Sequence, residues 1–301
     1  MKKKEVVKDD GTPYSIYTPF SKKWKALLDK KMLQPFHSGK LKNFIQKKPI
    51  PIPTIRSLNF ELSDYPTLFH LDEDVLRYYH KTRDIPAIDG TSKVGVHLRF
   101  GTVSIRYLVA KALELNETYL NELIWREFFM QMLWHYPRLV HESCKKEYEN
   151  IEWRNDEEEF ERWCQGQTGY PIVDAGMREL NETGFMHNRV RMITASFLVK
   201  HLLIDWRWGE AYFAKKLLDY ELASNNGNWQ WVAGCGCDAA PYFRIFNPYT
   251  QTKRFDSKLQ YIQKWIPELN SFSYPQPMID HEQARSRCLR VYKKALETKI
   301  K

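Results

Sequence analysis

Residues 168–231 read TGYPIVDAGMRELNETGFMHNRVRMITASFLVKHLLIDWRWGEAYFAKKLLDYELASNNGNWQW. The stretch predicts helix after helix, because apolar residues recur at helical spacing and alternating β-branched residues are scarce. Pro171 suits the first position of a helix and Gly184 suits its C-terminal stop. A second, apolar helix is predicted from His187 to about Leu203. The stretch therefore favours an all-α fold.

Polar groups interrupt this apolar pattern at particular positions. Asn188, Arg191 and Met192 share one side of the second predicted helix, while Arg189 points elsewhere. Arg191 and Asp219 are natural partners for a buried ion pair. The stretch thus contains polar residues that a purely structural core would not need.

The end of the stretch pairs amides with indoles. Asn225, Asn226 and Gly227 predict a turn that ends a helix and aims amides inward, with an ordinary C-cap loop as the alternative. Trp229 and Trp231 are two residues apart, which on a helix separates them by roughly 200°. We expect one ring to serve a cofactor and the other a ligand.

Outside this stretch the pattern after Pro66 is also helical. Helices are predicted over Leu71–Thr82, Ser104–Leu115 and Tyr119–Tyr136, and Asn155 is expected to open another as a capping residue. The expected domains are residues 1–34, with a short extended piece and an amphipathic helix around Trp24–Leu33, a linker or wrapping loop at 35–66, and a helical domain at 67–301.

The chain of 301 residues carries a formal charge of +9 and is rich in aromatic residues, with 10 Trp, 17 Tyr and 16 Phe. A polyanionic partner, either nucleic acid or an acidic membrane surface, fits this charge, and so does a basic protein with dispersed lysines. Five cysteines follow no disulfide-scaffold pattern, so we interpret Cys235 and Cys237 as structural and expect a reducing compartment. With neither a membrane-length apolar run nor a signal-like start, the expected location is the cytoplasm.

In NELIWREFF, Glu122, Trp125, Arg126 and Phe129 share one helical face. A simple amphipathic helix with an internal pair between Glu122 and Arg126 is the plain interpretation. Neither GxxxxGK[ST] nor GxGxxG is present, so a nucleotide would have to be held in another way.

Several long motifs in one order change that interpretation. Residues 168–231 resemble the flavin-binding core of class I DNA photolyases and cryptochromes, and RDIPAIDGTSKVGVHLRFG, NELIWREFF and DAAPYFRIFNPYTQTKRFD extend the resemblance from about Tyr79 to the C-terminus. The photolyases that act on cyclobutane pyrimidine dimers are the most similar. The resemblance implies a helical FAD-binding domain and a light-dependent carbon–carbon lyase that repairs DNA by electron transfer from excited, reduced FAD.

The resemblance assigns the FAD contacts. They match the following residues: Tyr79, Thr91, Ser92, Lys93, Val94, Gly95, Arg191, Asp219, Tyr220, Glu221 and Asn225. Relatives often have Ser where this chain has Gly95, and Asp where it has Glu221. Asn225 matches the residue that faces flavin N5, which favours repair over signalling, because many signalling relatives carry Asp or Cys there.

The substrate contacts are implied in the same way. Trp125 and Trp231 match the two walls around the flipped-out dimer, Glu122 matches the carboxyl group that hydrogen-bonds it, and Asn188 matches a contact on the other side. Photolyases that act on the 6-4 photoproduct resemble one another in having His near this point. Because His187 is here followed by Asn188, the resemblance favours the cyclobutane dimer as substrate.

Two further sets complete the implied site. The tryptophan chain that brings electrons to the flavin matches Trp229, Trp206 and Trp153. The arginines of the DNA-binding face match Arg83, Arg126, Arg189 and Arg244. No metal site is expected.

Relatives begin with an α/β domain that holds an antenna chromophore, and the segment GTPYSIYTPFSKKW is similar to only its last strand and helix. We therefore expect no antenna chromophore, and either a partner in trans that supplies the missing domain or a monomer. Two alternatives stay open: a blue-light signalling flavoprotein of cryptochrome type without repair activity, and a basic DNA-binding remnant that retains no flavin.

Overall fold

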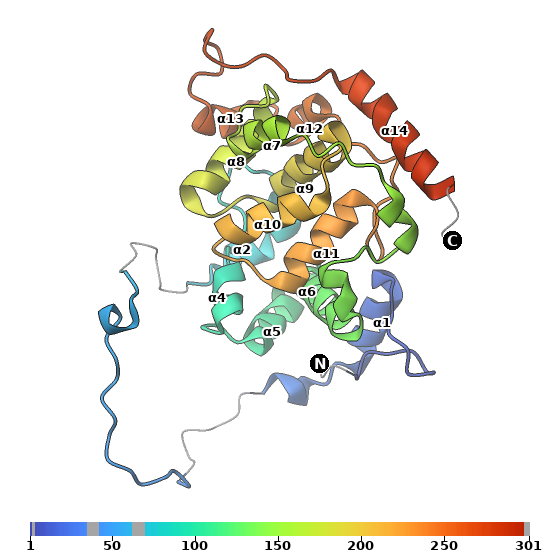
Figure 1. Cartoon of the computed structure of the whole chain (residues 1–301). Helices are drawn as coiled ribbons and strands as arrows, with labels where there is room; N and C mark the ends of the chain where they lie inside the picture. The colour runs from blue at the N-terminus through green and yellow to red at the C-terminus, as the bar shows by residue number, and fades with distance from the viewer. Residues whose placement is uncertain (2–3, 35–41, 62–69, 298–301) are drawn as a thin grey trace.

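The computed structural model describes residues 1, 4–34, 42–61 and 70–297, and these are folded almost entirely into helices (Figure 1). In the described ranges the backbone pairing of β type is an isolated antiparallel bridge between Val7 and Pro13. Among the helices of these ranges, none combines the length and the apolar composition that a membrane span requires. The predicted all-α class is confirmed.

The described ranges contain α-helices, short 3₁₀ helices and one π-helix. The α-helices are α1 (Tyr17–Leu27), α2 (Glu73–Arg77), α3 (Tyr79–Thr82), α4 (Gly95–Phe100), α5 (Ile105–Leu115), α6 (Glu117–His135), α7 (Glu157–Cys164), α8 (Pro171–Thr183), α9 (Asn188–Ser196), α10 (Trp206–Lys216), α11 (Leu222–Ala233), α12 (Pro248–Phe255), α13 (Gln260–Trp265) and α14 (His281–Glu297). Short 3₁₀ helices are η1 (Lys30–Leu33), η3 (Arg56–Leu58), η4 (Pro137–Val140) and η5 (Lys146–Asn150), and η6 (Phe197–Leu202) is a π-helix.

Two apolar cores organise these helices. The larger is built around α8, α9, η6, α10 and α14, and the smaller joins α1 to α5 and α6. Helix α11 belongs to both, since its Trp229 and Val232 enter the larger core and its Ala223 the smaller. Figure 1 shows α11 between α6 and the α9–α10 pair. This helix therefore forms the seam of the fold.

The seam depends on a close approach between α6 and α11. A Cβ placed on Gly227 would lie 2.2 Å from a ring carbon of Phe129. Gly227 is in the middle of α11, so the predicted helix-ending turn at Asn225–Gly227 is wrong. The glycine is explained by packing and not by a turn, since a larger residue would push the two helices apart.

Two N-terminal helix boundaries also differ from the prediction. The helix expected around Trp24–Leu33 begins earlier, at Tyr17, and ends at Leu27, where extended backbone at Leu28 separates it from η1. The helix expected over Leu71–Thr82 is two short ones, α2 and α3, interrupted at Tyr78. Hydropathy alone did not locate either break.

The cap of α7 lies one residue later than predicted. Asp156, and not Asn155, accepts the backbone N–H of Glu159 at 2.9 Å. Asn155 has left-handed backbone, with φ of +49°, and its Oδ1 accepts the backbone N–H of Asp205 at 2.8 Å. Asn is one of the few side chains that tolerate this conformation, so the residue joins two loops instead of starting the helix.

The predictions for the central stretch are confirmed in outline. Pro171 is the first residue of α8 and Gly184 is its left-handed C-cap. The apolar helix expected from His187 to about Leu203 is α9 followed by the π-helix η6, with His187 as N-cap and Leu203 in the left-handed region at the end.

The domain limits at 34 and 66 stay predictions, because residues 35–41 and 62–69 lie outside the described ranges. Between them, residues 42–61 contain only η3 as a helix and run outside the bundle (Figure 1). Ile45 and Ile52 in this segment are 82% and 90% exposed.

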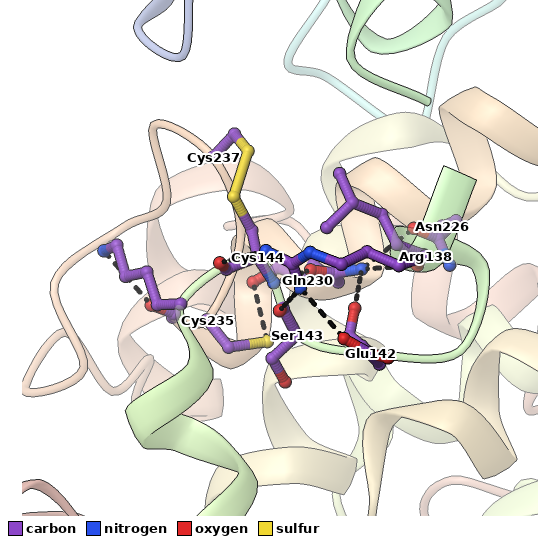
Figure 2. The surroundings of a disulfide bond; sticks show 11 residues. Arg138, Glu142, Ser143, Cys144, Asn226, Gln230, Cys235 and Cys237 are labelled. Carbon is purple, nitrogen blue, oxygen red and sulfur yellow. Dashed lines mark hydrogen bonds and ion pairs between the residues drawn. A yellow bond between two sulfur atoms is a disulfide. The ribbon is translucent and has the colours of Figure 1, made fainter. Parts of the chain in front are cut away.

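A disulfide between Cys144 and Cys237 ties the loop before η5 to the loop after α11, as Figure 2 shows. The backbone N–H of Cys144 also donates to Gln230 Oε1 on α11 at 2.9 Å. This pairing spans 93 residues and was not predicted from the cysteine spacing. Cys235, expected to be structural, is free and buried, and burial raises the pKa of its thiol to about 12. The disulfide fixes the position of the chain directly after Trp231's helix.

Reduction of this disulfide is expected to lower the free energy of unfolding by about 2–4 kcal/mol, because the unfolded chain regains the freedom of a long loop. Denaturant titrations with and without a thiol reductant measure the difference, and a Cys144→Ser/Cys237→Ser double variant should no longer respond to the reductant. Titration of five free thiols in the untreated, unfolded protein would contradict the prediction.

Candidate functional site

The site lies along the seam, where three cavities adjoin. The inner cavity, of about 560 Å³, is lined mainly by residues of α9, α10 and α11 together with the loop before α11. The outer cavity, of about 830 Å³, shares Asn188, Met192, Ser224 and Asn228 with it. A side cavity of about 1160 Å³ meets the inner one at Asp219. Shared lining residues thus connect the three spaces along the seam.

The predicted ion pair between Arg191 and Asp219 is present in the inner cavity. Arg191 donates from Nη2 to Asp219 Oδ2 at 2.9 Å and from Nε to the Met186 carbonyl at 2.7 Å. The second carboxylate oxygen, Asp219 Oδ1, is buried and accepts no hydrogen bond from the described residues. A buried acceptor without a donor is costly, so this atom is suited to a polar ligand.

Gly95, where relatives often carry Ser, lies against the same carboxylate. A Cβ at this position would lie 2.9 Å from Asp219 Cβ and 3.0 Å from Oδ2. The glycine therefore leaves Asp219 in place, and a serine would require it to move.

Glu221 has a structural task that the resemblance did not imply. It is the N-cap of α11, where Oε1 accepts the backbone N–H of Ala223 at 3.0 Å and Oε2 accepts that of Ser224 at 2.9 Å. Both oxygens are thus engaged at the wall of the inner cavity. The residue fixes the start of α11 next to Asp219 and Tyr220.

Asn225 lines the inner cavity with a fixed amide. Its Nδ2 donates to the backbone oxygen of Glu210 at 3.1 Å and to Glu210 Oε1 at 2.8 Å. Burial raises the pKa of the Glu210 carboxyl, and the amide of Asn225 counteracts this shift. Sequence reasoning missed Glu210, although its place four residues after a predicted chain tryptophan, Trp206, put it on the same helix.

The remaining predicted cofactor contacts are not among the residues that line the inner cavity. Ser92 and Lys93 line the side cavity, and Thr91 lines a neighbouring cavity of about 750 Å³. Tyr79 packs edge-on against Tyr119, whose hydroxyl is 3.0 Å from Ser92 Oγ. Val94 is the N-cap of α4 and is buried.

The outer cavity brings together the four residues predicted to hold a substrate. Glu122 and Trp125 come from α6, Asn188 from α9 and Trp231 from α11. Trp231 faces this cavity while Trp229 lines the inner one, as their angular separation on a helix predicted.

Glu122 pairs with Arg83 and not with Arg126, so the amphipathic-helix interpretation of this face is wrong. Desolvation raises the pKa of the Glu122 carboxyl, while the Arg83 guanidinium opposes the shift. The carboxyl therefore takes up a proton more readily than a carboxyl in water.

The four predicted DNA-binding arginines have different surroundings. Arg83 and Arg126 line the outer cavity. Arg189 is held by Asp84 at 2.8 Å and lies over the ring of Phe255, and Arg244 is exposed. Asp84, which orients Arg189, was not found from the sequence.

The three predicted chain tryptophans are buried to different degrees. Trp229 and Trp206 are fully buried, and Trp153 is partly buried. Trp163, which the prediction did not include, lies edge-on to Trp229 with 6.3 Å between ring centroids. Trp153 contacts the ring of Tyr292 at 6.1 Å.

Comparison with known proteins agrees with this geometry. Residues 119–273 match the family described as the FAD binding domain of DNA photolyase. The chain is 41% identical to a deoxyribodipyrimidine photo-lyase of Vibrio cholerae and 38% identical to that of Escherichia coli, in each case over 95% of this chain and 69% of the relative. These matches decide the family. The chain belongs to the DNA photolyase family.

Solved photolyase structures share the fold. A bacterial class III photolyase from Agrobacterium tumefaciens superposes with a TM-score of 0.84 at 33% identity, covering 99% of this chain and 72% of the other. A Synechocystis cryptochrome gives 0.76 at 29% identity, covering 97% and 69%. Because both repair and cryptochrome proteins have this photolyase fold, the site residues must separate them.

The inner cavity fits FAD on two observations. Asp219 Oδ1 is a buried acceptor that receives no donor from the part of the chain that the structure describes, and a polar cofactor with hydroxyl groups would supply one. The cavity also combines apolar walls with fixed polar groups from Arg191, Glu221 and Asn225.

Asp219→Asn is expected to weaken FAD retention about tenfold or more, because the charge that holds Arg191 and the acceptor in the inner cavity are both altered. Fluorescence titration of apoprotein with FAD measures the dissociation constant. Glu268→Gln is the matched control, since it breaks an arginine pair with Arg178, at 2.6 Å, away from these cavities. Equal affinities for both variants and the wild type would refute the role of Asp219.

Proposed function

We propose that this photolyase-family chain is a deoxyribodipyrimidine photo-lyase, which repairs cyclobutane pyrimidine dimers in DNA under light with FAD as its cofactor. One observation carries the proposal: the four candidate substrate contacts, from three helices, line one cavity that adjoins the candidate FAD cavity through Asn188. Curated relatives over most of the chain bear the name of this enzyme.

The outer cavity suits a flipped-out pair of pyrimidines. Trp125 and Trp231 offer aromatic faces for stacking, which is worth about 1–3 kcal/mol per base. Asn188 and Glu122 line the same cavity and supply hydrogen-bonding groups. An unstacked, damaged dinucleotide costs less to extrude than an intact one, so such a pocket selects for damage.

Reduced FAD, excited by light, would supply the electron that splits the cyclobutane ring and receive it back. The chain's own contribution is position and charge. Because the pKa of Glu122 is raised, its protonated carboxyl can donate a hydrogen bond to a carbonyl that gains negative charge. Asn225, held by Glu210, presents a neutral amide in the inner cavity without a ready proton.

The contact roles carry over as proposals. Tyr79, Thr91–Gly95, Arg191, Asp219, Tyr220, Glu221 and Asn225 would hold FAD; Trp229, Trp206 and Trp153 would carry electrons; Arg83, Arg126, Arg189 and Arg244 would bind the DNA backbone. Arg83 would do so while also orienting Glu122. We also propose, from the sequence, a cytoplasmic location and damaged DNA as the partner. The same holds for a monomer or a partner in trans, and for the absence of an antenna chromophore.

Light-dependent loss of thymine dimers from a short oligonucleotide tests the function directly. Protein with chemically reduced flavin should repair in light and not in the dark. Glu122→Ala should lower the repair yield about three- to tenfold and spare light-driven flavin reduction. Trp229→Phe should lower light-driven flavin reduction and spare repair by protein whose flavin is already reduced. Light-driven flavin reduction with no repair would indicate cryptochrome-like signalling, and a purified chain without flavin absorbance would indicate the DNA-binding remnant.

The pH dependence of repair should follow Glu122. Because its pKa is raised from the usual 4.5, its contribution to folding stability is full below that value and is lost as pH rises through the folded pKa. As pH rises through the folded-state pKa, the carboxyl also loses the proton that it would donate to the substrate, so repair should decline over that pH interval. Glu122→Gln should have a flat profile in this range, because an amide donates at every pH. Parallel profiles would contradict the assignment.

A further inference from the structure

Tyr17, the first residue of α1, covers one face of Trp125. The ring centroids are 3.7 Å apart and the planes differ by 4°, so the stack is nearly parallel. Tyr17 does not line the outer cavity, although Trp125 does. A ligand in that cavity therefore meets the opposite face of the indole.

Three contacts besides the stack hold Tyr17. Its hydroxyl donates to the backbone oxygen of Asn121 at 2.9 Å, and the edge of its ring meets Phe128 with 6.0 Å between centroids. Its backbone N–H donates to Asp238 Oδ2 at 3.2 Å. Asn121 lies one turn before Trp125 on α6, so both ends of the tyrosine ring are fixed to the helix that carries the indole.

Asp238 connects this arrangement to the second aromatic wall. It follows Cys237 in the loop after α11, and its backbone is left-handed, with φ of +52°. Helix α11 carries Trp231, and the disulfide at Cys237 fixes the same loop. Tyr17 thus contacts α6 through its ring and hydroxyl, and the segment after α11 through its backbone.

Trp125 has no comparable support on its own helix. Phe128 meets it edge-on and Phe129 lies tilted by 32°, each with 5.5 Å between centroids. Neither residue covers a face of the indole. A stacked ring removes the freedom of Trp125 before a ligand arrives, which lowers the entropy lost on binding.

We propose that Tyr17 is a positioning residue for the substrate pocket. By stacking on the face of Trp125 that points away from the outer cavity, it sets the plane in which the indole meets the flipped-out dimer. The inference rests on the proposed function for the identity of the ligand, and on the contacts of α1 for the role of Tyr17. It gives the segment before the helical domain a direct part in substrate recognition.

The test compares variants that remove different parts of the contact. Tyr17→Leu removes the ring, and Tyr17→Phe removes only the hydroxyl. Phe20→Leu is the matched control, because Phe20 is buried on the same helix and touches Phe128, with 5.2 Å between centroids, but makes no ring contact with Trp125. Asp238→Gly loosens the backbone anchor and retains the stack, should Tyr17→Leu fail to fold.

Binding of a dimer-containing oligonucleotide should weaken about five- to tenfold in Tyr17→Leu and about two- to threefold in Asp238→Gly. Tyr17→Phe and Phe20→Leu should stay within about twofold of the wild type. Repair per bound dimer at saturating DNA should change less than affinity, which separates positioning from loss of chemistry. Equal affinity in Tyr17→Leu and the wild type, or an equal loss in Phe20→Leu, would overturn the proposal.

A second measurement is independent of DNA. In protein labelled with 5-fluorotryptophan, the Trp125 fluorine resonance, assigned by its absence in Trp125→Phe, should shift or broaden in Tyr17→Leu and not in Phe20→Leu. An unchanged resonance in Tyr17→Leu would overturn the role of Tyr17. If the wild type does not distinguish dimer-containing from undamaged DNA, the proposed function fails, while the fluorine spectra still decide whether Tyr17 holds Trp125.

Discussion

The approach of α6 to α11 is the contact on which the rest of the structure depends. It is possible only because Gly227 has no side chain where the ring of Phe129 lies. This contact joins the two apolar cores, and it brings Glu122 and Trp125 on one helix to the same cavity as Trp231 on the other. Packing of the fold and assembly of the site are therefore one event.

The polar groups at this seam have partners that leave specific atoms for a ligand. One oxygen of Asp219 accepts a hydrogen bond from Arg191, and the other is buried with no donor among the described residues. Glu221 uses both oxygens to cap α11, and Asn225 is held by Glu210. Most of the charge in the site is thus committed to holding its shape, and a few atoms remain for chemistry.

The sequence predicted the residues of the site better than the contacts that hold those residues in place. The division of Trp229 and Trp231 between two cavities and the limits of α8 follow from local spacing, and the pair of Arg191 with Asp219 follows from their opposite charges in one apolar stretch. The structure shows each of them. The partner of Glu122, the disulfide and the stack of Tyr17 on Trp125 join residues far apart in the chain. Periodicity carries no information on such contacts. The glycine at 227 was mistaken for a turn because packing and turns favour the same residue.

Because the inner cavity is lined by side chains of the larger core and of the start of α11, a bound cofactor would add contacts that only the folded chain offers. Folding and loading are then linked by mass action: each tenfold rise in free cofactor above its dissociation constant adds about 1.4 kcal/mol to the folded state. The supply of flavin in the cell would therefore set how much of this protein survives as well as how much of it is active.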